Sequence, residues 1–146
     1  MIYLASPFFN EEQLNMVKRI EKALDQAEIE YFSPRSEGVL IEMTPEEKEL
    51  RMKAIFQSNI DHIWDASLVV AVIDNYDTGT VWEMGYAYGM DVPIFTISDH
   101  DYGLNVMVRQ SVETHNTKID NLIINVMEWL DNEPLTVFDE LTKDVT

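Results

Sequence analysis

The stretch VVAVIDNYDTGTVWEMGYAYG, residues 69–89, carries the clearest structural signal in the chain. It begins with an uninterrupted apolar run, which is typical of a strand in a parallel sheet with both faces covered. A loop with two aspartates follows, and then a segment with helical character from about Gly79 to Met90. A strand that leads through a short polar loop into a helix is the repeating unit of an α/β fold.

The same alternation continues on both sides of this stretch. Apolar runs predict strands within residues 1–6, 29–35 and 92–98, and periodic patterns predict helices within 10–26, 44–65, 103–110 and 117–132. Asn10 and Thr44 are suited to cap the first two of these helices. The sequence therefore predicts an open α/β fold with a mainly parallel sheet and helices on both faces, in a single domain spanning residues 1–146. It predicts no definite structure for an acidic C-terminal tail from about residue 133.

The composition narrows the classes of partner. The chain has 146 residues, 27 acids against 10 bases and a formal net charge of −17, which would repel a nucleic-acid backbone. It contains no cysteine, which excludes disulfides, thiolate metal sites and cysteine nucleophiles. The N-terminus lacks the pattern of a signal peptide, and no apolar run approaches the roughly 18 residues of a membrane span. We therefore expect a soluble, cytoplasmic domain that binds neither nucleic acid nor a membrane.

Several well-known kinds of site have no motif in this sequence. Neither a G-x-G-x-x-G loop after the first strand nor a G-K-[ST] motif is present, which disfavours dinucleotide cofactors and Walker-type nucleotides. No serine lies in a G-x-S-x-G elbow. His62, His100 and His115 do not have the spacing of metal ligands. We expect neither a cofactor nor a metal ion.

Carboxylates stand out in what remains. Ligands of open α/β sheets bind beyond the carboxyl ends of the strands, where Asp74 to Gly79 follow the central strand. Gly79 is expected to let this loop turn and to be one of the substrate-binding residues. Glu83 is expected in the first turn of the next helix, where the helix dipole favours the ionised carboxylate. Such a residue is either a nucleophile in a crevice or a plain dipole partner, and Tyr3 in the first strand could orient it or be a buried strand aromatic.

Four ordered segments resemble the nucleoside 2-deoxyribosyltransferases over nearly the whole chain. They are IYLASPFF at residues 2–9, the spaced Asn59, Ile63 and Asp65, the run VVAVID with DTGTVWEMGYA at 69–87, and LNVMVRQ at 104–110. The resemblance implies a flavodoxin-like fold and exchange of one nucleobase for another on 2-deoxyribose, without a cofactor. It also implies a homo-oligomer whose active sites are shared between subunits.

The resemblance further implies roles for particular residues. Glu83 matches the nucleophile that attacks the anomeric carbon, and Tyr3 matches the tyrosine that orients it. Asp77 matches an acid that contacts the base and helps to protonate it as it leaves. A carboxylate suits this chemistry because it stabilises an oxocarbenium-like transition state and then captures the sugar covalently, with retained configuration.

The remaining implied contacts concern substrate binding. Phe8 would line the base pocket, and Asn59 stands where some members have an aspartate that handles the base. Asn105 and Met107 match a segment presented to the adjacent subunit, where the asparagine would bind the sugar 5′-hydroxyl. Glu37 is a further candidate contact to the base.

Two other functions compete with base exchange. A deoxynucleoside 5′-monophosphate N-glycosidase would transfer the sugar to water, but its phosphate calls for a basic first loop, whereas ASPFFNEEQ is acidic and aromatic. A non-catalytic nucleoside-binding module would have little use for a nucleophile. Some family members end in a short aromatic C-terminus that reaches an active site; this chain ends in ELTKDVT, and we assign no role to it.

Overall fold

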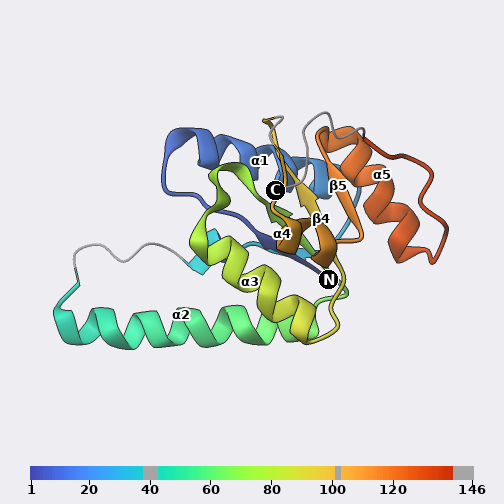
Figure 1. Ribbon diagram of the computed structural model, residues 1–146. Coiled ribbons are helices and arrows are strands. Elements are labelled where there is room, and N and C mark those ends of the chain that lie inside the picture. Colours follow the sequence, from blue (N-terminus) through green and yellow to red (C-terminus); the bar gives the residue numbers. More distant parts are fainter. Residues whose placement is uncertain (38–42, 101–102, 140–146) are drawn as a thin grey trace.

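Five parallel strands form the sheet at the centre of the molecule (Figure 1). The computed structural model describes residues 1–37, 43–100 and 103–139. The strands are β1 (Ile2–Ala5), β2 (Tyr31–Phe32), β3 (Leu68–Val72), β4 (Ile94–Ile97) and β5 (Thr114–Asn116). Their order, β2-β1-β3-β4-β5, is that of the flavodoxin-like fold, and the direction of chain progression reverses between β1 and β3. The predicted fold class is confirmed.

The apolar strands of the predicted core lie in the middle of this sheet. β3 pairs with β1 through Leu4 opposite Val70, and with β4 through Val70 opposite Phe95. Every residue of β1, β3 and β4 is buried. Because successive side chains point to opposite faces, each of these strands contributes to two separate hydrophobic clusters.

Helices cover both faces of the sheet. They are α1 (Glu11–Gln26), α2 (Pro45–Asp65), α3 (Thr78–Gly89), α4 (Val106–Ser111) and α5 (Ile119–Leu130), with short 3-10 turns η1 (Pro34–Glu37) and η2 (Asp74–Tyr76). Helices α1 and α5 cover one face, and α2, α3 and α4 cover the other (Figure 1). The loops that follow β1 and β3 leave the sheet side by side, at the carboxyl ends of these neighbouring strands.

The predicted helix starts follow from local capping. The Asn10 side chain accepts the Gln13 backbone N–H (2.9 Å), while the Gln13 side chain accepts from the Phe9 N–H and not from Asn10. Thr44 and Glu47 form a reciprocal capping box at the start of α2. Each cap satisfies backbone donors that the first helical turn leaves without a partner.

One strand escapes prediction from the sequence. β5 has only three residues, Thr-His-Asn, and lacks the apolar pattern of the other strands. It is a strand because it pairs with β4, with Thr114 opposite Phe95 and Asn116 opposite Ile97. A polar segment this short acquires its structure from its neighbour, which the sequence does not reveal.

The C-terminal tail is tied to the body although it has no regular structure at residues 133–139. Leu135 packs against the cluster on the α1 and α5 face. The Asp139 carboxylate accepts from the Thr117 N–H and from the Asn121 side-chain amide, both at 2.7 Å. No helix within the described ranges is long and apolar enough to cross a membrane.

Candidate active site

Tyr3 and Glu83 meet where the strand order reverses. The Tyr3 hydroxyl on β1 donates a hydrogen bond to Glu83 Oε2 on α3, although the two residues are 80 positions apart in the sequence. The Tyr3 side chain is fully buried, and its ring stacks on Phe32 of β2 with centroids 5.8 Å apart. Parallel sheets bind ligands at this switch point, so the pair lies where the fold favours a site.

The protonation of Glu83 differs from the expectation. α3 begins at Thr78, which places Glu83 in the second turn, and the first turn contains no acid. Because the dipole acts mainly within the first turn, it cannot be what sets the charge of this carboxyl. Burial raises the pKa of Glu83 to about 7; the Tyr3 hydrogen bond lowers it and the charge of Asp77 raises it. The prediction of a dipole-stabilised carboxylate at the helix start is therefore wrong.

The same contact affects Tyr3. Burial, the nearby charge of Glu83 and the hydrogen bond to it all raise the pKa of the Tyr3 phenol. Tyr3 therefore remains a neutral hydrogen-bond donor, and Glu83 is the member of the pair that titrates near neutral pH.

Two adjoining cavities open around Glu83. One, of about 540 Å³, lies over the strand ends and is lined by Ser6, Phe8, Phe9, Pro34, Ile55, Asn59, Asp77, Thr78, Gly79 and Glu83. The other, of about 380 Å³, lies between α2 and α3 and is lined by Met52, Ile55, Phe56, Asn59, Ile60, Ile63, Gly79, Trp82 and Glu83. Volumes of this size accommodate small organic ligands. The loops that follow β1, β2 and β3 therefore meet at the larger cavity.

Asp77 lies on the wall of the larger cavity and caps α3. Its Oδ2 atom accepts from the Thr80 backbone N–H at 3.0 Å and from the Thr80 hydroxyl at 3.2 Å. Gly79 lies within the helix and does not make the turn, contrary to the expectation; Asn75 and Tyr76 make it, with φ angles of 60° and 45°. A Cβ atom at Gly79 would lie 3.3 Å from Asp77 Oδ2, so the glycine leaves space beside the carboxylate.

Asn59 reaches both cavities from α2. Its Oδ1 atom is buried and has no hydrogen-bond partner among the described residues. Buried polar atoms of proteins are nearly always paired, so an unpaired one beside a cavity requires an explanation.

Glu37 lies outside both cavity linings. Its carboxylate accepts from the Ser58 hydroxyl at 3.1 Å and lies 3.8 Å from the Arg51 guanidinium, so it joins η1 to α2. The preceding Arg35 is paired with Glu21 (Nε to Oε2, 2.8 Å). The sequence leaves SEGVLIEM, residues 36–43, as a possible loop over a site, and residues 38–42 of it lie outside the described part of the chain.

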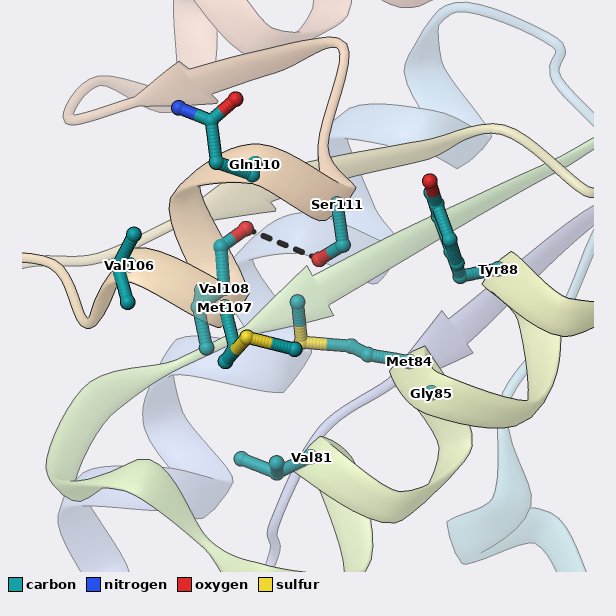
Figure 2. Close-up of a pocket in the computed structure, with 9 residues that line it drawn as sticks. All are labelled: Val81, Met84, Gly85, Tyr88, Val106, Met107, Val108, Gln110 and Ser111. Carbon is teal, nitrogen blue, oxygen red and sulfur yellow. Dashed lines mark hydrogen bonds between the residues drawn. The ribbon is translucent and has the colours of Figure 1, made fainter.

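Asn105 and Met107 lie at α4, away from Glu83 of the same chain. Asn105 caps this short helix, since its Oδ1 atom accepts the Met107 N–H at 2.8 Å. Met107 is 75% exposed and lines an apolar groove of about 270 Å³ between α3 and α4. Figure 2 shows Met107 and Met84 projecting into this groove from the two helices. The structure thus brings together Tyr3, Phe8, Asn59, Asp77, Gly79 and Glu83, and leaves Glu37, Asn105 and Met107 apart.

The sequence indicated Trp82 as either a pocket wall or a core residue, but it did not single out the apolar residues Ile55 and Phe56 of α2. Ile55 lines both cavities around Glu83, and the ring centroids of Phe56 and Trp82 lie 5.6 Å apart. All of them belong to periodic helical patterns that look the same for core and cavity residues. Among the described residues, no group of three or more histidine, aspartate or glutamate side chains could hold a metal ion.

Comparison with known proteins agrees with this geometry. A family model described as nucleoside 2-deoxyribosyltransferase matches residues 2–127. A 2-deoxyribosyltransferase of the psychrotolerant bacterium Bacillus psychrosaccharolyticus is 30% identical, with a TM-score of 0.72, over 83% of this chain and 88% of that one. Curated protein sequences gave no significant match.

Two more distant structures share the fold. The 2-deoxyribosyltransferase of Leishmania mexicana is 19% identical with a TM-score of 0.52, over 77% of this chain and 72% of that one. A conserved protein of Enterococcus faecalis V583 is 18% identical with a TM-score of 0.55, over 84% of each chain. Since the family model covers most of the sequence and the solved structures share its fold, the chain belongs to the nucleoside 2-deoxyribosyltransferase family.

Proposed function

We propose that this protein exchanges nucleobases on 2-deoxyribose, with Glu83 as the covalent nucleophile. The observation that carries the proposal is the Tyr3–Glu83 hydrogen bond at the switch point, beside two cavities. A carboxyl with a pKa of about 7 is ionised in a large fraction of molecules at neutral pH, and only this form attacks carbon. Tyr3 fixes the orientation of the attacking carboxylate.

The reaction proceeds in two displacements. A Glu83 carboxylate oxygen forms a bond to the anomeric carbon as the bond from that carbon to the base nitrogen breaks, and the electron pair leaves with the base. Asp77 gives a proton to the departing base. Oδ2 of Asp77 already accepts two hydrogen bonds from Thr80, so Oδ1 is the oxygen from which this proton is transferred. A nitrogen of the second base then attacks the same carbon and passes its N–H proton to the Asp77 carboxylate, which releases the Glu83 carboxylate, restores the acid and retains the configuration.

The cavity walls suit an uncharged nucleoside. Phe8 supplies an aromatic surface for the base in the larger cavity. The buried Oδ1 of Asn59 would accept a hydrogen bond from the base, which explains an otherwise unpaired acceptor. Glu37 was a further candidate for a base contact, but its bonds to Ser58 and Arg51 favour a structural role.

Assembly into a homo-oligomer is a further part of the proposal. Asn105 and Met107 are exposed at α4 of this chain, where they are able to reach a neighbouring molecule. In an oligomer with shared active sites, Asn105 would bind the sugar 5′-hydroxyl in the adjacent subunit. Gel filtration with light scattering tests this part, and a monomer at working concentration would contradict it.

The N-glycosidase alternative requires recognition of a phosphate. No lysine or arginine is among the described residues that line the two cavities around Glu83. The ionised Glu83 carboxylate would instead repel a phosphate dianion placed beside it. This charge pattern favours nucleosides over nucleotides.

Incubation with deoxyinosine and free adenine tests the proposed reaction. We expect deoxyadenosine and hypoxanthine in equal amounts, and we expect Glu83→Ala to lower the rate by several orders of magnitude. Glu83→Gln is the matched control for folding, because its amide oxygen accepts the Tyr3 hydrogen bond but forms no glycosyl ester. Hydrolysis of deoxynucleoside monophosphates without base exchange would indicate the N-glycosidase instead, and binding without either reaction would indicate a nucleoside-binding module.

A further inference from the structure

The η2 turn after β3 is bonded to both described ends of the connection between β4 and α4. At its start, the buried Asp74 carboxylate accepts from the Ser98 hydroxyl at 2.5 Å. At its end, the Tyr76 hydroxyl donates to the Gly103 carbonyl oxygen at 3.2 Å and accepts from the Asn105 backbone N–H at 3.0 Å. The turn therefore links the loop that carries the candidate site to the beginning of α4.

The backbone at this turn is in an uncommon conformation. Asn75 and Tyr76 follow one another with φ angles of 60° and 45°, in the left-handed region that bulky side chains rarely occupy. Such a conformation persists only where its surroundings determine it. The Tyr76 ring packs against the hydrophobic cluster on the α3 face of the sheet. The backbone N–H of Tyr76 donates to the Ile73 carbonyl oxygen at 3.0 Å. The next residue is Asp77, the N-cap of α3.

We propose that Tyr76 is a positioning residue that fixes the start of α4 relative to Asp77. A phenol hydroxyl is able to donate and accept at the same time, as the Gly103 and Asn105 contacts require, whereas a phenylalanine ring does neither. The bond to Asn105 holds the backbone of the residue that caps α4, two residues before Met107. Tyr76 acts through this backbone, and it is absent from the lining of the cavities around Glu83.

The consequence for turnover rests on the proposed function. There, Asn105 contributes to a sugar site shared between subunits while Asp77 serves the base. Displacement of α4 would then move Asn105 relative to the sugar in the adjacent subunit's site, which would weaken binding of the sugar more than it slows the bond-breaking step. Loss of the Tyr76 hydroxyl should therefore raise KM for the deoxynucleoside more than it lowers kcat.

Tyr76→Phe, compared with Tyr31→Phe, tests the inference. Both variants remove one phenol hydroxyl, but Tyr31 lies on the edge strand β2, and its hydroxyl bonds Asp25. Hydrogen–deuterium exchange of peptides covering residues 103–111 measures, without substrate, how strongly the start of α4 is protected against local opening. We expect Tyr76→Phe to lower protection there by about five- to thirtyfold, since each net hydrogen bond of roughly 1 kcal/mol changes an equilibrium about fivefold. Tyr31→Phe should leave these peptides unchanged.

The kinetic measurement uses the full-length variants with deoxyinosine and adenine. We expect KM for deoxyinosine to rise severalfold in Tyr76→Phe, with a smaller change in kcat, and neither to change in Tyr31→Phe. Unchanged protection at residues 103–111 would overturn the inference, and so would lost protection with unchanged KM. If the wild-type protein exchanged no bases at all, the proposed function would be wrong, and the protection data alone would decide whether Tyr76 holds α4.

Discussion

Tyr3→Phe should move the acidic limb of the pH–rate profile to higher pH. The substitution keeps the buried ring that stacks on Phe32 and removes only the hydroxyl that donates to Glu83. That hydrogen bond lowers the pKa of Glu83, which burial has raised to about 7. Without the donor, the carboxylate loses a stabilising partner and the pKa rises further.

The size of the shift follows from the strength of the lost bond. A hydrogen bond to a charged group contributes about 1.5–3 kcal/mol, which corresponds to a pKa change of about 1–2 units. The pKa of Glu83 would then rise from about 7 to roughly 8–9. At pH 7 the ionised fraction would fall from about one half to between about one tenth and one hundredth. Base exchange at pH 7 should therefore slow by about five- to fiftyfold.

The assay is the rate of deoxyadenosine formation between pH 5 and pH 10 under kcat/KM conditions, with Tyr31→Phe as the control. The deficit of Tyr3→Phe should shrink at high pH, because every Glu83 side chain is then ionised and only the loss of its orientation by Tyr3 remains. A uniform loss at all pH values would show that Tyr3 acts by orientation alone. A profile with an unmoved acidic limb would falsify the assignment of the titrating group to Glu83.

Three further predictions concern charge and stability. Glu83→Gln should remove a pH dependence of the folding stability. The pKa of the wild-type carboxyl is raised from 4.5 to about 7 on folding, so this group stabilises the fold fully below pH 4.5. That stabilisation is lost as the pH rises through 7. The free energy of unfolding in urea is measured for both proteins, and the value of Glu83→Gln is subtracted from that of the wild type. This difference should be about 2–3 kcal/mol smaller at pH 8 than at pH 5, and the same difference at both pH values would contradict the prediction. Asp77→Asn should abolish base exchange but keep the cap of α3, because an asparagine side chain also accepts the backbone N–H. Asp77→Ala should abolish exchange and also lose about 1 kcal/mol of stability. Near-normal turnover in Asp77→Asn would exclude a proton transfer by Asp77. Glu21→Gln should cost about 2 kcal/mol of unfolding free energy at neutral pH, because it removes the charge that pairs with Arg35, and should leave the exchange rate of the folded protein unchanged. The pKa of Glu21 is lowered by its bonds to Arg35, so this stability is lost as the pH falls, and an equal cost at acidic pH would contradict the explanation.

Features with a local cause could be predicted from the sequence. The long strands at the centre of the sheet were evident from uninterrupted apolar runs, and the starts of α1 and α2 from Asn10 and Thr44. A cap depends on a side chain and a backbone N–H only three residues away, so neighbouring letters are sufficient to define it. The ordered motifs also pointed to Tyr3, Asp77 and Glu83 as one site, and the structure brings Tyr3 into contact with Glu83.

Features that depend on distant contacts were decided by the tertiary structure. β5 is a strand only because β4 pairs with it. The Glu37 carboxylate contacts Ser58 and Arg51 of α2 and does not line a cavity around Glu83. The turn before α3 is made by Asn75 and Tyr76, whose hydroxyl contacts lie almost thirty residues along the chain, and not by Gly79. No pattern in the neighbouring residues predicts any of these contacts.

The charge of Glu83 illustrates the difference between the two levels. From the sequence, its place near a helix start suggested a carboxylate stabilised by the dipole. In the folded protein it lies one turn too far along α3, and burial together with Tyr3 and Asp77 sets its pKa near 7. The sequence determined which carboxyl is in the site, because its motif is local. Only the tertiary structure determined its protonation, because desolvation depends on everything that packs around the group.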